Sequence, residues 1–349
     1  MMKMKKLAYI IAAALMLLPG CKKESIADYS SREQDFEAWI AAQKNVYKVY
    51  PDARRVGFGT YILKDEVIGT EDWDFNDKPC ALVHYIREEL DGDVLSTNIE
   101  DVAKRIGSYE KTAFYGVFAW PRLTSMEGIR EGMEGMKIGG TRIIAVPAWL
   151  MTSEQKDSEK EYKKKETDTD ACVYRITLVG AVNDVIQRQI DMLEDYSQKY
   201  MAGVDSTYYA GDEELGKRGF YFYSKLLPPD AEKPETSSSI KINYTARRIE
   251  DGGIFDTNVA DTAIKYKIFD PDEDYSPVKV NLDEDWSKIT MGDYESDLIS
   301  GFKAGVFMMH KGESARFTFF SPLGYGNSGS YPYIPPYSPL CFDIDIVEE

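Results

Sequence analysis

The chain of 349 residues is poor in the residue types that build metal sites and disulfide frameworks. It contains two histidines, His84 and His310, and four cysteines. Structural zinc sites draw four ligands from these residue types, so we expect no metal. Asp270, Asp272 and Asp274 alternate like the start of a calcium loop, but Tyr275 occupies the sixth position, where such a loop needs glycine. We interpret this stretch as a solvated acidic turn.

Positive charge is also scarce. The net charge is −17 and the isoelectric point is about 4.7, whereas proteins that bind nucleic acids cluster lysine and arginine against phosphates. The sequence therefore predicts no nucleic-acid partner. One dense basic run, 163–165, lies among acidic residues, and we expect it to be a solvated loop. The chain has no phosphate loop, dinucleotide fingerprint or nucleophile elbow, and we expect no cofactor.

No apolar run is long enough to be a permanent membrane helix. Leu7 to Leu18 is short, follows three lysines and ends in Leu17-Leu18-Pro19-Gly20-Cys21. This ending resembles the lipobox of bacterial lipoproteins, which implies a signal peptide at 1–20 and lipidation of Cys21. An ordinary secretory signal is the alternative. Since Lys22 rather than Asp follows Cys21, the resemblance favours an outer-membrane lipoprotein that faces the periplasm.

The other cysteines are Cys80, Cys172 and Cys341. A compartment outside the cytoplasm permits disulfides, and Cys80 could pair with Cys172 because both fall in one predicted domain. Buried free thiols are the favoured state, and the pairing stays open because sequence does not give its geometry.

Periodicity and turn residues divide the body of the chain. A tether and a helix from Ser31 to Val49, capped by Ser31 or Asp35, occupy 21–55. Strand-like runs in the domain 56–181 are Thr60–Leu63, Ala81–Ile86, Thr141–Val146 and Cys172–Val179. A linker at 182–218 contains a helix at 183–202 and a loop at 203–218, and Gly219–Tyr223 begins the last domain, 219–349, with a turn at 228–239.

That last domain carries short motifs in a fixed order. They are Tyr244, Asp251-Gly252-Gly253-Ile254-Phe255-Asp256-Thr257-Asn258, Leu298-Ile299-Ser300-Gly301-Phe302, Ser321-Pro322-Leu323-Gly324-Tyr325-Gly326, Ile334-Pro335-Pro336 and Leu340-Cys341-Phe342-Asp343. Aromatic and branched side chains with a few polar groups are typical of a mostly apolar pocket. The ordered set resembles the FK506-binding-protein (FKBP) family of peptidyl-prolyl isomerases over 219–349.

Part of this pattern occurs twice. Asp91-Gly92-Asp93-Val94-Leu95-Ser96-Thr97-Asn98 follows Tyr85 as the later motif follows Tyr244, and a glycine-rich helix region comes next in each half, at Gly128–Gly140 and Gly301–Gly312. Such self-similarity indicates duplication. We therefore predict an α+β protein of two FKBP-like domains, each a curved antiparallel β-sheet wrapped over a short α-helix, joined by a helical linker.

The resemblance implies a site in the last domain only. It assigns polar, catalytic roles to Tyr244, Asp256 and Tyr325. It implies an apolar, substrate-binding wall from seven further residues: Phe255, Val278, Leu298, Ile299, Phe302, Ile334 and Phe342. Val278 replaces the family's usual aromatic residue and Phe302 its usual tryptophan, which predicts altered activity.

The first domain departs from the pattern at the site itself. Leu95 and Ser96 replace the Phe–Asp pair, Ile129 stands at the tryptophan position and Thr152 at the tyrosine position. A charged loop, 153–169, takes the place of Ile-Pro-Pro. Tyr85 and Tyr174 remain. We expect this domain to have a structural or a substrate-holding role.

The resemblance implies a lipid-anchored peptidyl-prolyl cis-trans isomerase outside the cytoplasm, with catalysis in the last domain. Its partners would be proline-containing unfolded or secreted polypeptides, the membrane through the lipid, and FK506-like macrolides. The alternative is a non-catalytic chaperone or binding protein of the same fold.

Overall fold

The computed structural model describes residues 26–164, 169–202, 219–292 and 298–347. These residues form two compact units. Of the described residues, those in 26–109 and 115–185 belong to the N-terminal unit, and those in 110–114 and 186–347 belong to the C-terminal unit. Predictions for Cys21, Lys165 and the loop 203–218 fall outside the described residues. Within the described part, no helix has the length and apolar character that crossing a membrane requires.

The N-terminal unit is built on one antiparallel sheet with strand order β1-β2-β8-β9-β4-β5, and β6 also pairs with β4. Its strands are β1 (Arg54–Val56), β2 (Thr60–Val67), β4 (Cys80–Glu88), β5 (Val94–Thr97), β6 (Phe118–Pro121), β8 (Thr141–Val146) and β9 (Cys172–Val182), beside a small ribbon of β3 (Glu71–Asp72) and β7 (Lys137–Ile138). Its helices are α2 (Ile26–Ala41), the π-helix η1 (Ala42–Val46), α3 (Glu100–Ile106), α4 (Glu127–Met133), the 3-10 turn η2 (Ala148–Leu150) and α5 (Glu159–Tyr162).

The C-terminal unit has a second antiparallel sheet, with order β10-β15-β16-β11-β13-β14 and with β12 also paired to β11. Its strands are β10 (Phe220–Leu226), β11 (Ser239–Arg248), β12 (Ile254–Thr257), β13 (Val278–Asn281), β14 (Thr290–Met291), β15 (Ser314–Phe319) and β16 (Leu340–Val347). Its helices are α6 (Val185–Tyr200), α8 (Ala260–Lys265), α9 (Ser300–Met308) and the 3-10 turns η3 (Trp286–Lys288) and η4 (Ser321–Leu323).

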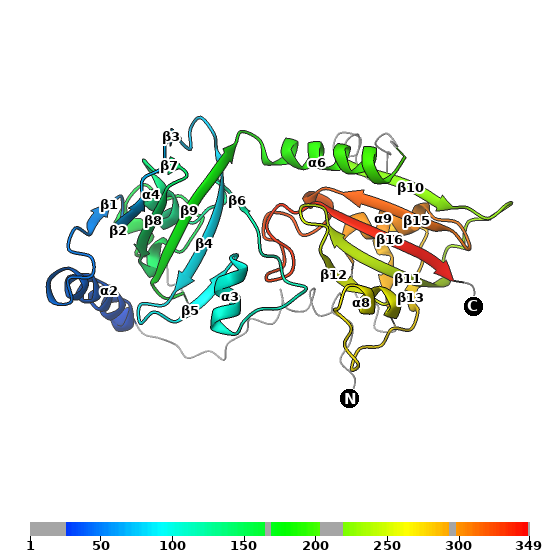
Figure 1. Cartoon of the computed structure of the whole chain (residues 1–349), viewed down its shortest axis with the longest axis horizontal. Helices are drawn as coiled ribbons and strands as arrows, with labels where there is room; N and C mark the ends of the chain where they lie inside the picture. Colours follow the sequence, from blue (N-terminus) through cyan, green and yellow to red (C-terminus); the bar gives the residue numbers. More distant parts are fainter. Residues whose placement is uncertain (1–25, 165–168, 203–218, 293–297, 348–349) are drawn as a thin grey trace. The chain divides into compact units, whose positions relative to one another are not determined.

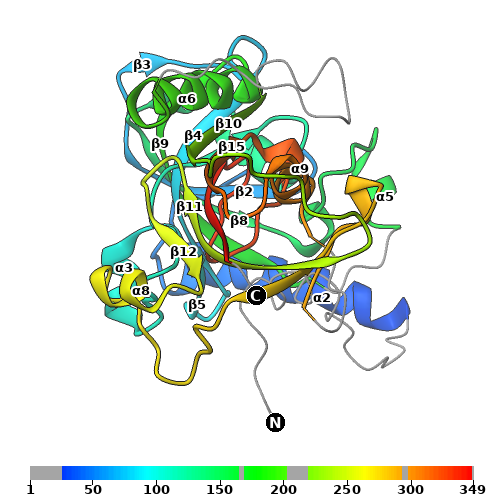
Figure 2. The same cartoon turned by 90° about the vertical axis from the view of Figure 1, so that its right-hand side faces the viewer.

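The two sheets share one topology (Figure 1). The order β2-β8-β9-β4, with β5 and β6 on β4, repeats as β10-β15-β16-β11, with β12 and β13 on β11. A short helix follows the hairpin β4–β5 in the N-terminal unit and the hairpin β11–β12 in the C-terminal unit (Figure 2). A second helix, α4 or α9, comes later in the chain, before β8 or β15. The predicted α+β fold with two antiparallel sheets is confirmed, and the strand prediction at Thr141–Val146 matches β8 residue for residue.

Glycine pairs let the second helix of each unit lie flat on its sheet. A Cβ atom on Gly301 would come within 2.4 Å of the Phe319 ring, and one on Gly305 within 2.4 Å of Phe317. In the N-terminal unit, a Cβ on Gly128 or Gly132 would meet β8 side chains at 2.2 and 2.5 Å. Residues four apart share one helix face, so glycine at both positions removes the side chains that would lift the helix from the sheet.

A threonine–asparagine pair fastens the hairpin to the next helix in both units. Asn258 Oδ1 accepts from the Tyr244 backbone N–H at 2.6 Å, and its Nδ2 donates to the carbonyls of Ile242 and Ser276 at 3.0 Å. Asn98 repeats this pattern with Tyr85, Val83 and Gly116. Buried polar groups are stable only when they are hydrogen-bonded, which explains why both copies carry Thr-Asn.

Aromatic rings fill the core of the C-terminal unit. Phe317, Phe319 and Phe342 stack across neighbouring strands, with centroids 5.7 to 6.4 Å apart. Phe302 meets Phe342 edge-on at 5.3 Å and is fully buried. Rings in these arrangements each bury a large apolar area, so this cluster anchors α9 to the sheet.

A long helix precedes each sheet and packs on the same unit. Phe36 and Ile40 of α2 are buried. In α6, Leu193 joins the core and Gln189 Oε1 accepts from the Ser321 backbone N–H at 2.7 Å. The predicted bounds of the first helix are wrong: it begins at Ile26, so neither Ser31 nor Asp35 caps it, and it ends at Ala41. Beyond this point Val46 and Val49 are exposed and do not extend the packed face.

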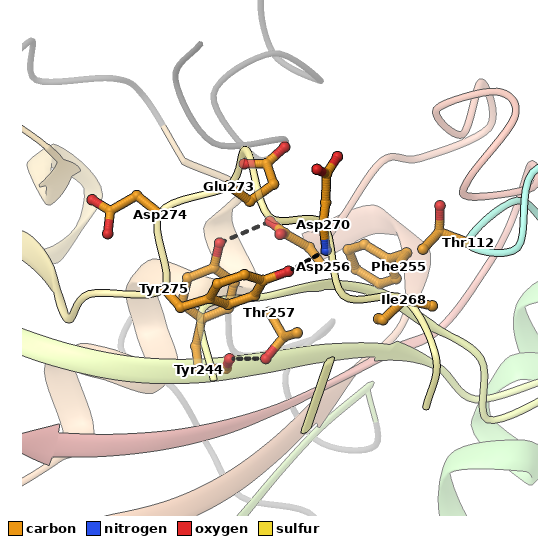
Figure 3. Close-up of a pocket in the computed structure, with 10 residues that line it drawn as sticks. All are labelled: Thr112, Tyr244, Phe255, Asp256, Thr257, Ile268, Asp270, Glu273, Asp274 and Tyr275. Carbon is orange, nitrogen blue, oxygen red and sulfur yellow. Dashed lines mark hydrogen bonds between the residues drawn. The ribbon is translucent and has the colours of Figure 1, made fainter. Parts of the chain in front are cut away.

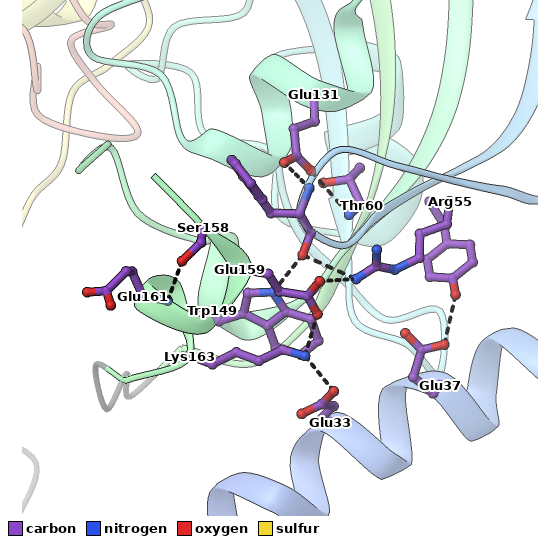
Figure 4. A network of polar contacts seen from close by, with 12 residues as sticks. Glu33, Glu37, Arg55, Thr60, Glu131, Trp149, Ser158, Glu159, Glu161 and Lys163 are labelled. Atoms are coloured by element: carbon purple, nitrogen blue, oxygen red, sulfur yellow. Dashed lines mark hydrogen bonds and ion pairs between the residues drawn. The ribbon is translucent and has the colours of Figure 1, made fainter. Parts of the chain in front are cut away.

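The charged loop of the N-terminal unit is folded against the domain (Figure 4). It contains α5, whose Tyr162 is buried. Lys163 lies 4.5 Å from the centroid of the Trp149 ring and pairs with Glu33 of α2 and with Glu159. The prediction of a solvated basic run is therefore wrong for Lys163, because acidic and aromatic partners from distant parts of the chain surround its ammonium group.

The structure describes three of the cysteines. Cys80, Cys172 and Cys341 are buried and none forms a disulfide. This confirms the favoured prediction and excludes the Cys80–Cys172 pairing in this structure.

Candidate active site

A buried tyrosine–aspartate pair forms the polar centre of the candidate site. Tyr244 lies on β11 and Asp256 on the neighbouring strand β12, and the Tyr244 hydroxyl donates to Asp256 Oδ2 at 2.9 Å. Burial, and then the negative charge of Asp256, raise the pKa of Tyr244 well above its ordinary value. The phenol therefore stays protonated at neutral pH and acts as a donor.

Tyr325 supplies a second hydroxyl near this pair. It follows η4 in a loop that is closed by a hydrogen bond from the Gly326 N–H to the Ser321 carbonyl at 2.8 Å. Burial and the charge of Asp256 raise the pKa of Tyr325. Its hydroxyl oxygen is buried and has no hydrogen-bond partner among the described residues. An unsatisfied buried polar group costs about 1–3 kcal/mol, so this hydroxyl is placed to bind an acceptor from a ligand.

A small cavity of about 30 Å³ opens beside the pair (Figure 3). It is lined by Thr112, Tyr244, Phe255, Asp256, Thr257, Ile268, Asp270, Glu273, Asp274 and Tyr275. Thr112 comes from the short segment 110–114 that groups with this unit. A cavity of this size holds about one or two water molecules, so a larger ligand would require its lining side chains to move.

The structure distributes the predicted site residues between this cavity and the core. Tyr244, Phe255 and Asp256 line the cavity. Ile299 and Tyr325 are partly buried and pack against the core. Five others are buried within it: Val278, Leu298, Phe302, Ile334 and Phe342. In this conformation these five are packed in the core and do not line the cavity, and their contact with substrate stays a prediction.

Arg248 is a residue of the site region that sequence reasoning missed. Its side chain is buried, donates to the Tyr333 carbonyl at 2.6 Å and to the Thr112 carbonyl at 2.8 Å, and pairs with Asp251 at 3.0 Å. A Cβ at Gly253 would lie 2.0 Å from this guanidinium. Gly253 was the available signal, since it makes room for the arginine that holds the Tyr333 carbonyl next to Ile334.

The loop between α8 and β13 has a second feature that the sequence did not reveal. Asp270, Asp272 and Asp274 are exposed, as predicted for a solvated acidic turn, and five residues of the loop also line the cavity: Ile268, Asp270, Glu273, Asp274 and Tyr275. Loop side chains are placed by long-range packing, so their spacing in the sequence carries little signal. No group of three or more potential metal ligands occurs among the described residues.

Comparison with known proteins supports a family for this part of the chain. Residues 230–347 match the family model described as FKBP-type peptidyl-prolyl cis-trans isomerase. A probable FKBP-type peptidyl-prolyl cis-trans isomerase of Haemophilus influenzae is 26% identical over 114 residues, which are 33% of this chain and 36% of that protein. FK506-binding protein 1 of Saccharomyces cerevisiae is 28% identical over 125 residues, 36% of this chain and 88% of that protein.

Among solved structures, the three FKBP domains of wheat FKBP73 align with 84% of this chain and 98% of theirs, at 16% identity and a TM-score of 0.28. The sequence matches support the FKBP-type peptidyl-prolyl isomerase family for the C-terminal domain. They span about a third of the chain and about a third of the Haemophilus influenzae protein.

Proposed function

We propose that this protein is a peptidyl-prolyl cis-trans isomerase whose catalytic site lies in the C-terminal domain and whose clients are proline-containing unfolded or secreted polypeptides. The observation that carries the proposal is the Tyr244–Asp256 pair near the buried Tyr325 hydroxyl, for which the described residues supply no hydrogen-bond partner. This arrangement lies within the region that matches the isomerase family.

Catalysis of this rotation requires only that the site binds the peptide and presents polar groups to it. The barrier to rotation about a peptide bond is about 18–20 kcal/mol, because the C–N bond has partial double-bond character. An apolar site removes water from the carbonyl of the residue before proline. The Tyr325 hydroxyl would donate to a substrate carbonyl, and Asp256 would hold Tyr244 at the polar edge. Donors that fit the twisted state better than the planar one lower the barrier.

An isomerisation assay on the purified full-length chain tests the proposal. We expect it to accelerate cis–trans exchange in Leu-Pro and Ala-Pro peptides, measured by protease-coupled kinetics and by NMR exchange, and we expect an FK506-like macrolide to inhibit it. Exchange at the uncatalysed rate by both methods would contradict catalysis.

The alternative of a non-catalytic chaperone or peptide-binding protein has its own support. The cavity is small, and Phe302 and Phe342 are fully buried. Both observations fit a protein that binds its partners at another surface. Under this alternative the protein would suppress aggregation of an unfolded client equally well with and without the Tyr325 hydroxyl.

We also propose that Cys21 carries lipid and holds the protein at the outer membrane, facing the periplasm. The support is the Leu17-Leu18-Pro19-Gly20-Cys21 motif after a short apolar run. Cys21→Ala should release the protein from membranes or block its maturation, as measured by fractionation and by mobility on gels. A variant that matures normally and stays with the membrane would refute lipidation.

A further inference from the structure

Carboxylates dominate one side of the candidate site. Four of the ten residues that line the cavity are acidic, namely Asp256, Asp270, Glu273 and Asp274, and none of the ten is lysine or arginine. Figure 3 shows Asp270, Glu273 and Asp274 on the loop above the Tyr244–Asp256 pair. A site walled by charge of one sign attracts ligands of the opposite sign.

Local hydrogen bonds hold this acidic loop in shape. The Tyr275 hydroxyl accepts from the Asp270 N–H at 3.0 Å, and Asp270 Oδ1 accepts from the Asp272 N–H at 3.0 Å. Asp274 accepts from both the N–H and the hydroxyl of Ser276 at 2.8 Å. A pre-ordered loop spends little entropy when a ligand binds, so its charges act on a ligand from fixed positions.

Aromatic groups on the same loop suit a long cationic side chain. Tyr275 lines the cavity and stacks on Phe269 with a centroid distance of 5.0 Å, and the Phe269 side chain is 46% exposed. Lysine and arginine lay their apolar stems on such surfaces while the charged end stays in water. The exposed ring faces also attract cations directly.

The Tyr325 hydroxyl does not line this cavity, but it is a separate sign that a ligand binds next to Asp256. It is buried without a partner among the described residues, and the charge of Asp256 acts on it. A backbone carbonyl of a bound peptide would satisfy it. A peptide fixed there would carry its neighbouring side chains past Asp256 towards the acidic loop.

We propose that the site prefers prolyl peptides with a lysine or arginine next to the proline, selected by the carboxylates of Asp270, Glu273 and Asp274. This inference rests on the proposed isomerase function and names its substrate class. The cationic end would lie among the carboxylates, its stem against Tyr275, and the prolyl carbonyl region against Tyr325.

The test compares peptides that differ in one residue beside proline: Lys-Pro, Leu-Pro and Glu-Pro. At low salt we expect kcat/KM for Lys-Pro to exceed that for Glu-Pro by roughly tenfold or more, since one charge pair at short range in water is worth roughly fivefold and several carboxylates act together. Because exposed charges are screened by salt, the ratio should fall towards that of neutral peptides in concentrated salt.

Variants separate the loop from the general charge of the protein. Glu273→Gln and Asp270→Asn should each lower the Lys-Pro to Glu-Pro ratio by roughly two- to fivefold, and asparagine keeps the side-chain acceptor for the Asp272 N–H. The matched control is Glu235→Gln, which removes an exposed carboxylate of the same unit that does not line the cavity. This control should leave the ratio unchanged.

The outcomes distinguish this inference from the proposed function. Turnover of Leu-Pro with equal rates for Lys-Pro and Glu-Pro would overturn the charge preference and leave the isomerase function standing. If no peptide is turned over, the isomerase function fails, and fluorescence anisotropy with labelled peptides then decides the preference. Equal binding of the lysine and glutamate peptides would overturn the charge preference. The preference is supported if the lysine peptide binds more tightly and if Glu273→Gln weakens that binding.

Discussion

The two units share one backbone fold, here called the frame, but differ in the side chains at the position of the candidate site. Both keep the Thr–Asn hydrogen bonds and the paired glycines of the second helix. Where the C-terminal unit has the Tyr244–Asp256 pair, the N-terminal unit has Tyr85 near Ser96, and no polar bond joins them in the described structure. The frame is preserved by packing and backbone pairing, so the polar chemistry can change without loss of the fold.

The aromatic residues at the corresponding position also differ in use. Tyr85 packs against Phe118, Trp120 and Tyr174 with centroid distances of 5.2 to 6.5 Å. This ring cluster stabilises the domain. The charged group that acts on Tyr85 and Tyr174 is the cation Arg87, whereas the carboxylate Asp256 acts on Tyr244 in the other unit.

The hairpin turns differ in the same way. The backbone N–H of Glu89 donates to the Asp93 carbonyl at 2.8 Å, as that of Arg248 does to Gly253 at 3.0 Å. Glu89 is exposed, whereas Arg248 is buried and holds the Tyr333 carbonyl. The residue at this one position therefore distinguishes the two turns. Glu89 leaves its turn exposed at the surface, whereas Arg248 connects its turn to the candidate site.

The largest expected effect comes from truncating the aromatic core. Phe302→Ala removes a fully buried ring and should cost about 3–5 kcal/mol of unfolding free energy. Ile129→Ala, at the equivalent helix position, should cost about 2–5 kcal/mol. Urea unfolding followed by fluorescence measures both. A cost well below 2 kcal/mol for Phe302→Ala would mean that this part of the core opens to water in solution.

The shared glycine pairs provide the next test. Gly305→Val and Gly132→Val should each cost roughly 1–3 kcal/mol or more, because a Cβ would overlap the strand side chains behind the helix. Equal losses in the two units would strengthen the view that the frame is common to both. If one variant folds as stably as the parent chain, the flat helix contact is not required in that unit.

Removal of a single oxygen separates catalysis from folding. Tyr325→Phe should keep the unfolding free energy or raise it by up to about 1–3 kcal/mol, because it removes an unsatisfied buried hydroxyl. It should lower kcat/KM, by up to about tenfold if 1.4 kcal/mol of transition-state binding is lost. Thr152→Val, two residues after η2 as Tyr325 is two residues after η4, is the matched control and should leave isomerisation unaffected. Equal activity of the Tyr325→Phe protein and the parent would favour the non-catalytic alternative.

The smallest effect concerns pH. Burial raises the pKa of Glu250 to about 7, above its ordinary value of 4.5, and Ser338 donates to its carboxyl at 2.8 Å. The folded protein therefore holds an extra proton between these two values, so this contribution to stability is full below pH 4.5 and is lost as the pH rises through 7. After allowance for partial exposure to solvent, we expect a loss of about 1–2 kcal/mol.

Glu250→Gln isolates this contribution. The variant should lack the extra slope of unfolding free energy between pH 5 and 8, which is measured as the difference from the parent chain. Parallel curves for the two proteins would show that Glu250 titrates normally.

These comparisons show where sequence reasoning works. The strands, the helix at 183–202 and the position of Thr152 followed from periodicity and repeat spacing, because those patterns record local backbone geometry. Arg248 and Lys163 did not, since their partners lie up to 136 residues away. The sequence did not predict that the acidic loop lines the cavity, because such a loop has the same residue pattern whether it faces water or a binding site.

The attachment of α6 to the C-terminal sheet has a consequence for engineering. Gln189 and Leu193 tie this helix to η4 and to the core that follows it, as Phe36 and Ile40 tie α2 to the sheet that follows that helix. In each unit, the repeated element is therefore a helix together with the sheet that follows it. A fragment that carries the C-terminal sheet should begin at Val185, because a fragment that starts at the sheet would expose the apolar surface on which α6 packs. A fragment that transplants the candidate site must also supply Thr112, which lines the cavity.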